Sequence, residues 1–248
     1  MFEMALTVAT FNLKGGTGKT TAVSNLGACL AMRQRPKLRI LLIDLDGQRT
    51  LSYSLGFDGH EPTALDWLSG DAIAPVQTNI KRLDLVPGDI GMFLYRPASG
   101  TVNNALKHIP DEYDLILLDC PPSLTEISSQ ALLSCDRVLL PTICQPACLK
   151  GVGEAINLIR GDAPNKPIDL LRVWYEGALV LTQEADTTLE SSAKTLDYNF
   201  LKNPIPKNVR IAEAVAHHQP VVEYSPRSAG AKAFKDLARE CTNLWGLK

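Results

Sequence analysis

The sequence lacks any long hydrophobic run. No apolar stretch approaches the roughly 20 residues that a helix needs to cross a bilayer. Residues 1–4 contain neither the basic segment nor the apolar core of a secretion signal. These absences argue against a membrane-spanning or secreted protein, so we expect a cytoplasmic one.

The sequence also has little net charge and no clustered cysteines. Its 248 residues carry a formal net charge of −2 and are 45% hydrophobic and 21% charged, which is typical of a globular protein and implies neither a nucleic-acid nor a membrane partner. The six cysteines are scattered, and the close pair Cys144 and Cys148 has no flanking His and no common zinc spacing. We expect reduced core thiols, with a zinc site as a minor alternative.

Strands and helices alternate along the chain, with no internal repeat or low-complexity tract. Apolar runs predict strands at 5–11, 39–44, 83–87, 113–119, 137–141 and 176–182. Helical spacing predicts helices at 20–33, 101–108, 149–159, 187–196, up to 217, and 229–245, while 47–52 and 161–167 are predicted loops. The pattern predicts one α/β domain over residues 1–248, a doubly wound, mostly parallel sheet with helices on both faces.

A glycine-rich segment after the first predicted strand has the pattern of a phosphate-binding loop. Its glycines let backbone N–H groups turn toward an anion at the start of the next helix. Lys19 is placed to reach the β- and γ-phosphates, and the Thr20 hydroxyl to ligate Mg²⁺. Leu13 occupies the position of the usual first glycine, and a second lysine follows it. The candidate nucleotide-binding residues are Lys14, Gly15, Gly16, Thr17, Gly18, Lys19, Thr20 and Thr21.

Carboxylates follow two of the predicted strands. Asp44 and Asp46 stand at the end of strand 39–44, where α/β proteins bind their ligands. Asp119 ends the apolar strand 113–119 in the manner of a Walker B aspartate, which holds Mg²⁺ from the side opposite Thr20, through a water. An acid at a strand end can also cap the following turn, and for Asp44 that alternative stays open.

Four motifs in order carry a family resemblance. They are Lys14–Thr21, Asp44–Gln48, Asp119–Ser123 and Ile205–Ala214, which together span most of the chain. With them the chain resembles the ParA branch of the ParA/MinD family of deviant Walker A P-loop ATPases. The resemblance implies a homodimer that forms with ATP, sandwiches two ATP·Mg²⁺ between its subunits and hydrolyses ATP slowly until a partner stimulates it.

The resemblance also implies roles for single residues. Lys14 corresponds to the signature lysine, which crosses the dimer interface to the partner's nucleotide, and Asp46 to the aspartate that positions the attacking water. Asp44 falls closer to the metal's second shell, and Pro206 is a weak candidate for the adenine contact. The implied catalytic residues are Lys14, Lys19 and Asp46, and the implied metal-associated residues are Thr20, Asp44 and Asp119.

The switch segment departs from the family pattern. Gly47 replaces the usual proline, and Arg49 and Thr50 replace the usual Gly-Asn. These changes indicate a switch loop that is more mobile or that recognises something different.

The C-terminal third has a charge opposite in sign to the rest. Residues 202–239 contain seven basic and three acidic residues, a net charge of +4, which leaves −6 for the remainder. A local basic surface binds phosphate backbone without sequence preference, so we hypothesise ATP-dependent binding to non-specific DNA. Isolated exposed charges are the ordinary alternative. The candidate DNA-binding residues are Lys207, Arg210, Lys232 and Lys235.

The resemblance implies a biological task and leaves three rivals. The implied task is partition or positioning of a cargo by a nucleoid-associated protein, with a ParB-like or adaptor protein that stimulates hydrolysis. A MinD-like membrane cycle needs a free amphipathic C-terminal helix. An iron–sulfur relative needs interface cysteines, for which Cys120 and Cys144 lack the ligand spacing. A scaffold without nucleotide leaves the phosphate-loop residues unexplained.

The apolar stripe of the last predicted helix tests the membrane alternative. A stripe of this width is what a surface helix needs to dock on its own core, so core packing is the favoured use and no membrane partner is expected. Its residues are Phe234, Leu237, Ala238, Cys241, Leu244 and Trp245.

Overall fold

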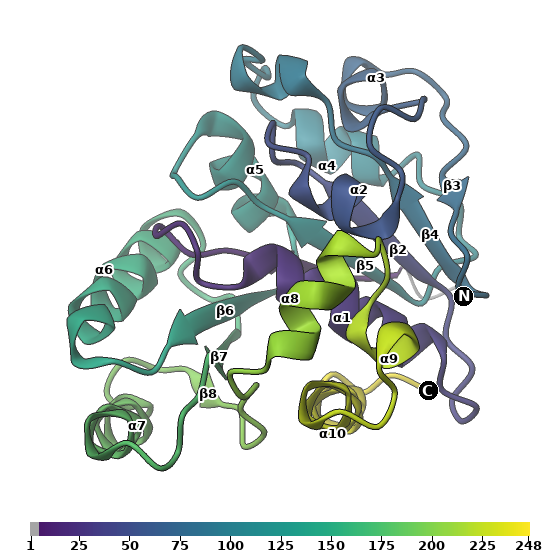
Figure 1. The fold of residues 1–248 in the computed structure, drawn as a ribbon. Helices are drawn as coiled ribbons and strands as arrows, with labels where there is room; N and C mark the ends of the chain where they lie inside the picture. The colour runs from purple at the N-terminus through teal and green to yellow at the C-terminus, as the bar shows by residue number, and fades with distance from the viewer. Residues whose placement is uncertain (1–4) are drawn as a thin grey trace.

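An eight-stranded sheet forms the centre of the molecule (Figure 1), in the order β3-β4-β2-β5-β1-β6-β7-β8. The computed structural model describes residues 5–248, so the expectation about residues 1–4 lies outside the described residues. Neighbouring strands are parallel except for β3 and β4, which are antiparallel. The strands are β1 (Leu6–Thr10), β2 (Ile40–Asp44), β3 (Val76–Gln77), β4 (Leu83–Val86), β5 (Leu115–Asp119), β6 (Arg137–Ile143), β7 (Ile168–Val173) and β8 (Asn199–Phe200).

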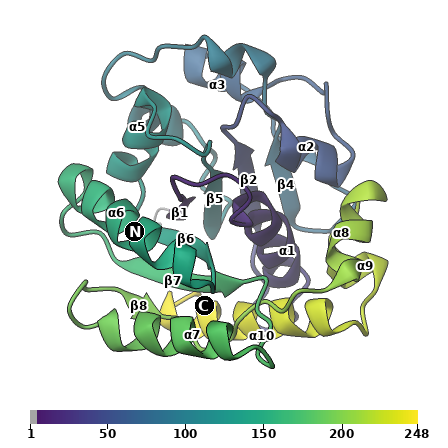
Figure 2. The same ribbon diagram turned by 60° about the vertical axis from the view of Figure 1, so that its left-hand side comes forward.

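Helices cover both faces of the sheet, as predicted. One apolar core contains side chains of α3 to α7, and the other contains side chains of α1, α2 and α8 to α10. Figure 2 shows α5 and α6 on one side of the central strands and α1 on the other. The helices are α1 (Lys19–Ala31), α2 (Thr50–Leu55), α3 (Ala64–Ser69), α4 (Thr101–Leu106), α5 (Glu126–Ser134), α6 (Pro146–Asp162), α7 (Val180–Ser192), α8 (Val209–Ala216), α9 (Val221–Tyr224) and α10 (Ala229–Leu244), with a 3-10 turn η1 (Ile90–Phe93).

The central strands are apolar throughout because both of their faces are buried. In β5, Leu115 and Leu117 belong to one core, while Ile116 and Leu118 belong to the other. A strand that contributes to two cores reads as a continuous apolar run, which is why the sequence indicates it so clearly.

The predicted strand at 176–182 is wrong. The strand in this part of the chain is β7, and helix α7 begins at Val180. The apolar pattern did not predict β7, because the charged residues Asp169 and Arg172 interrupt it. Both are buried and paired: Asp169 accepts a hydrogen bond from Arg137 Nε at 2.8 Å, and Arg172 Nη1 donates to Asp186 at 2.7 Å. Buried charges that are paired in this way are tolerated inside a sheet.

The predicted loop at 47–52 is wrong in its second half, because α2 begins at Thr50. Arg49 precedes the helix in the left-handed region, with φ 55°, and its N–H donates to the Asp46 carbonyl at 2.8 Å. Helix α6 is also longer than predicted and continues into the predicted loop at 161–167. The segment that follows the expected switch aspartate is therefore a tight turn that opens directly into a helix.

Candidate nucleotide-binding site

The loop between β1 and α1 is an open cradle with glycines where the backbone requires them. Gly16 and Gly18 have φ of 73° and 78°, a region that favours glycine. A Cβ built on Gly15 or Gly16 would meet no atom within 4 Å. The free space lies before the N-terminus of α1, where backbone N–H groups and the helix dipole favour an anion.

Lys19 lies below this loop and is almost fully buried, with 7% of its surface exposed. Its ammonium group donates to the carbonyl oxygens of Asn12 and Lys14, each at 3.3 Å. Burial lowers the pKa of Lys19, although the nearby Asp119 carboxylate opposes that shift. A lysine held by long hydrogen bonds to its own loop has donors that a phosphate can take over.

Thr20 and Asp119 meet on the floor of the site. The Thr20 hydroxyl donates to Asp119 Oδ2 at 2.7 Å. The topology explains the meeting, because β5 pairs with both β1 and β2, and Asp119 is aligned with Thr10 on one side and Asp44 on the other. The side chains of Thr10, Asp44 and Asp119, from three separate strands, therefore lie together at the carboxyl edge of the sheet.

The polar atoms at the same place suit a cation. Asp119 Oδ1 and Thr10 Oγ1 are buried and have no hydrogen-bond partner within the described part of the chain. Burial and the neighbouring Asp44 raise the pKa of Asp119 well above its ordinary value. A carboxylate with an orphaned oxygen next to a threonine hydroxyl fits Mg²⁺, which takes hard oxygen ligands and completes its shell with water and phosphate oxygens.

Asp44 is occupied by its own chain. Its Oδ2 accepts from the backbone N–H and hydroxyl of Ser52, at 3.0 and 2.7 Å, and its Oδ1 accepts from the Asp46 N–H at 3.2 Å. Burial raises the pKa of Asp44 to about 6, in opposition to these hydrogen bonds. The carboxylate organises the turn that follows β2, as the capping alternative describes, and its role in the metal's second shell stays a prediction.

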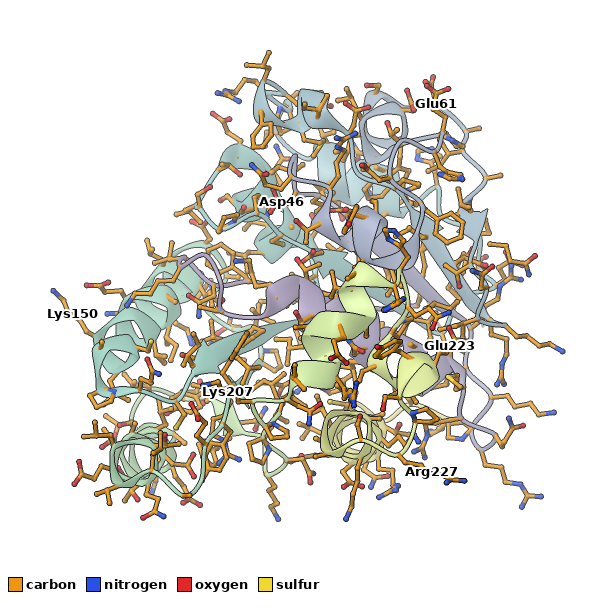
Figure 3. The ribbon with its side chains drawn as sticks, in the orientation of Figure 1. Asp46, Glu61, Lys150, Lys207, Glu223 and Arg227 are labelled. Atoms are coloured by element: carbon orange, nitrogen blue, oxygen red, sulfur yellow. The ribbon has the colours of Figure 1, made fainter. Side chains whose placement is uncertain are left out.

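Asp46 lies on that turn, close to the site. It is 9% exposed, and its Oδ1 accepts from the Gln48 N–H at 3.0 Å. Figure 3 shows Asp46 in the upper half of the molecule, near the end of β2. Its charge acts on both Lys19 and Asp119, which places the three side chains in one electrostatic neighbourhood.

Lys14 points away from the cradle and toward α6. Its Nζ donates to the Ala147 carbonyl at 3.1 Å, and its stem crosses Gly151, where an added Cβ would lie 2.8 Å from Lys14 Cε. The loop reaches α6 in Figure 1. Within the described residues Lys14 forms no ion pair, so the predicted signature lysine is exposed and held by one neutral acceptor.

The predicted DNA-binding residues come from two segments, Lys207 and Arg210 from around the start of α8 and Lys232 and Lys235 from α10. Lys207 pairs with Glu176 at 3.2 Å, and Arg210 pairs with Glu213 at 2.6 Å. On α10, the Lys235 ammonium donates to the Pro226 carbonyl at 2.9 Å. Lys232 is exposed and has no ion pair in the region from residue 5 to the C-terminus. Figure 3 shows Lys207 and Arg227 at separate places along the lower half of the molecule.

Pro206, the candidate adenine contact, is half-buried beside β7. It forms an isolated parallel bridge with Tyr175, whose N–H donates to the Ile205 carbonyl at 3.0 Å. The bridge brings this loop to the carboxyl end of β7, and a Cβ on Gly18 would approach Val173 there to 3.3 Å. The structure thus places Pro206 at the strand next to the phosphate loop, and its contact with adenine stays a prediction.

A second group of cations was missed by the sequence analysis. The chain that follows the C-terminal end of α1 lies beside the loop before β4, where β2 and β4 begin. There, Arg82 Nη2 donates to the Arg33 carbonyl at 2.9 Å. Within residues 5–248 none of these side chains has a carboxylate partner. The basic run at 33–37 was a visible signal, but the pairing of β2 with β4 was needed to join it to 81–82. This α1–β4 basic cluster consists of Arg33, Arg35, Lys37, Lys81 and Arg82.

The apolar stripe of α10 packs into the core as predicted, except for Leu244, which is 41% exposed. Phe234, Leu237, Ala238 and Cys241 are each at most 1% exposed and belong to the same core as α1. No helix of the described residues is long and apolar enough to cross a membrane.

The cysteines named in the alternatives are mostly inside the protein. Cys120 and Cys144 are buried, and Cys148 is half-buried. Over the described range, no three His, Cys, Asp or Glu side chains are grouped so that they alone hold a metal ion.

Comparisons with known proteins agree with this geometry. A family model described as an AAA domain matches residues 5–166. The sporulation initiation inhibitor protein Soj of Bacillus subtilis is 35% identical, covering 96% of this chain and 98% of its own. The chromosome partitioning protein ParA of Caulobacter vibrioides is 33% identical, covering 94% and 92%.

Solved structures extend the likeness to three dimensions. The septum site-determining protein MinD of Pyrococcus horikoshii, complexed with Mg-ADP, has a TM-score of 0.81 and 29% identity, with 98% of each chain covered. Cobyrinic acid a,c-diamide synthase of Mycobacterium smegmatis, with bound ADP and magnesium, has a TM-score of 0.79 and 26% identity, covering 98% of this chain and 96% of its own.

Proposed function

The chain belongs to the ParA/MinD family of P-loop ATPases, and we propose that it is an ATP-dependent dimerising switch that partitions DNA or positions another cargo. One observation carries the proposal. Under an open glycine cradle, Thr20 meets Asp119, whose second oxygen has no hydrogen-bond partner among residues 5–248. That arrangement suits MgATP, and related proteins were solved with Mg-ADP and with an ATP analogue and magnesium.

Each side chain has a task in this proposal. The cradle N–H groups and Lys19 bind the β- and γ-phosphates, while Thr20 and Asp119 hold Mg²⁺. Bound magnesium neutralises charge that develops on the transferred phosphoryl group. Asp46 orients the attacking water on the side of the site that the turn after β2 covers.

The proposal includes a slow basal rate, and the position of Lys14 supports it. In a single chain its ammonium donates to the Ala147 carbonyl on α6, away from its own cradle. In the ATP dimer it reaches the partner's phosphates and stabilises charge there, as an arginine finger does. Hydrolysis is then limited by assembly and by the partner that completes the site, a ParB-like or adaptor protein.

We place non-specific DNA on the basic surfaces of the dimer, which makes the protein cytoplasmic and nucleoid-associated. Lys232 and Lys235 on α10 are the candidates with no carboxylate partner among the described residues. Lys207 and Arg210 each have a carboxylate partner, which a DNA phosphate must replace. Helix α10 packs against α1 in one apolar core, and α1 ends two residues before Arg33 of the α1–β4 basic cluster. Dimerisation doubles these weak surfaces and raises avidity without any new type of contact.

The test is light scattering after size-exclusion chromatography on Asp46→Ala, with and without MgATP, followed by DNA binding on each peak. The proposal expects a dimer that forms with ATP and retains DNA, while the monomer does not. A nucleotide-independent oligomer, or an ATP dimer that ignores DNA, contradicts the nucleoid mechanism.

Two charge reversals then locate the DNA surface. We expect Lys232→Glu/Lys235→Glu to weaken DNA retention and to flatten its salt dependence, with ATP-dependent dimerisation unchanged. Arg35→Glu/Lys37→Glu is the matched pair on the α1–β4 basic cluster. If that pair alone abolishes retention, the DNA surface lies at the start of β2 and not on α10.

A further inference from the structure

We propose that Phe93 is a positioning residue for Asp46: its ring covers Gly47 and fixes the turn that carries the aspartate. The inference rests on the proposed role of Asp46 in hydrolysis. It explains why the switch segment has glycine at position 47.

The glycine is required by the ring and not by the backbone. Gly47 is not among the glycines of the described chain that have positive φ, so an ordinary residue fits its backbone. A Cβ at this position would instead lie 2.9 Å from both Cγ and Cδ2 of Phe93 and 3.0 Å from Cε2. Any side chain at 47 displaces the ring or the turn.

Phe93 comes from a separate segment that is itself well ordered by hydrogen bonds. It ends η1, whose N-cap Asp89 accepts from the Gly91 N–H at 2.6 Å, and the Leu94 N–H donates to the Gly91 carbonyl at 2.9 Å. The ring is nevertheless 50% exposed. An aromatic ring laid half-exposed over a catalytic turn contributes less to the core than a buried one, which favours a local task.

A second contact joins the segment after β4 to the segment after β2, and it involves Asp44, two positions before Asp46. The Gly88 N–H donates to Ser52 Oγ at 2.8 Å, and that hydroxyl donates to Asp44 Oδ2 at 2.7 Å. Asp44 in turn accepts from the Asp46 N–H. A Cβ on Gly88 would lie 2.9 Å from Asp44 Cγ, so these segments pack closely here too.

Asp46 is thus held between two fixed points. The polar relay through Ser52 fixes the backbone at and before the aspartate, and the Phe93 ring fixes the residue directly after it. Gly88, which begins the relay, and Phe93 both come from the chain that follows β4. Misplacement of a catalytic group by about 1 Å lowers a rate by up to roughly 100-fold, so a contact of this kind affects turnover more than ATP binding.

The experiment is a double-mutant cycle on the full chain, read by ATP turnover, KM for ATP and ATP-dependent dimerisation. We expect Phe93→Ala and Gly47→Ala each to lower kcat by roughly tenfold, with KM changed less than about twofold. In Gly47→Ala/Phe93→Ala the added methyl meets no ring, so the loss is smaller than the product of the two single losses. Leu94→Ala, at an exposed neighbouring position, is the matched control and leaves kcat unchanged.

Three outcomes overturn the inference: wild-type kcat in Phe93→Ala, a raised KM at constant kcat, or losses that multiply in the double variant. Phe93→Leu, which retains an apolar contact, keeps the test open if the alanine variant fails to fold, and it must retain more turnover than Gly47→Ala. Asp46→Ala separates this inference from the proposed function. If Asp46→Ala abolishes hydrolysis and Phe93→Ala does not, the positioning role alone fails; if Asp46→Ala hydrolyses normally, the proposed function fails with it.

Discussion

The nucleotide cradle and the C-terminal basic region differ in how their polar groups are satisfied. At the cradle, side chains from β1, β2 and β5 are buried together, and Asp119 Oδ1 is left without a partner in the described chain. In the basic region of residues 202–239 every cation but the half-buried Lys235 is exposed, and Arg210 and Arg239 pair with acids three residues away. Buried polar atoms that lack partners indicate a ligand, whereas exposed and paired charges are compatible with many uses.

The largest expected effect is on the free energy of unfolding, and it tests whether the C-terminal region folds independently of the sheet. Trp245 Nε1 donates to Asp169 Oδ2 at 2.8 Å, and Arg137 pairs with the same buried carboxylate. Asp169→Ala leaves Arg137 without its partner and should lower the free energy of unfolding by about 3–5 kcal/mol. Urea denaturation measures this. Asp197→Asn, which removes the charge of an exposed partner of Arg160 and suits the positive φ of this position, is the control with little effect. A separate early transition of the C-terminal helices would show that they are independent after all.

The next effect compares two lysines of the cradle. Lys19→Ala removes the buried ammonium below the loop and should weaken MgATP binding by roughly 100-fold or more, because charge-assisted contacts to phosphate are strong. Lys14→Ala should leave binding to the monomer nearly unchanged, since Lys14 contacts Ala147 and not the cradle. Calorimetric titration of both variants at low protein concentration gives the comparison. Equal losses would place Lys14 in its own chain's site.

A smaller effect is expected on the Tm of Asp119→Asn, and its sign should differ without and with MgATP. Asp119→Asn removes one of two buried carboxyls and should raise the Tm of the ligand-free protein, by roughly 2–4 °C per kcal/mol of repulsion relieved. The same variant should lose the Tm increase that MgATP gives the native protein. Thermal unfolding with and without MgATP measures both. A lower Tm without ligand would contradict the destabilising role of the pair.

The same carboxyls predict a pH dependence. The pKa of Asp44 is raised to about 6 from an ordinary 3.8, so the folded protein binds this proton more tightly than the unfolded chain. The ligand-free protein should therefore gain stability as pH falls from about 6 to about 4. In Asp119→Asn this gain should shrink, because burial and the neighbouring Asp44 raise the pKa of Asp119 as well, and its proton uptake on folding is then lost. An unchanged pH profile would remove the coupling between the two groups.

The smallest effect concerns the basic region. Glu213→Gln releases Arg210 from its ion pair and should raise DNA affinity of the ATP dimer by about two- to fivefold at low salt, since exposed pairs are weak. Filter binding at two salt concentrations measures it. Glu190→Gln on α7 is a control with the same change in net charge. If both variants gain equally, the effect is one of total charge and Arg210 has no local role.

The sequence predicted what short-range patterns encode. The cradle, the strand leading to Asp119 and the core-facing stripe of α10 are local, so glycine spacing and apolar periodicity were sufficient to find them. Strand β7 was missed because its charged residues are satisfied by partners elsewhere in the chain. The contact between Gly47 and Phe93 gives no signal in the sequence, because it depends on how the segment after β4 folds back on the turn after β2.

The hydrogen bond between Lys14 and Ala147 sets how often the lysine is free to leave α6. A single hydrogen bond at the protein surface competes with water, so at equilibrium a fraction of the molecules has its lysine released before any second subunit arrives. Assembly with ATP therefore needs no separate activating step at this residue. A side chain at Gly151 would crowd the lysine's stem and enlarge that released fraction.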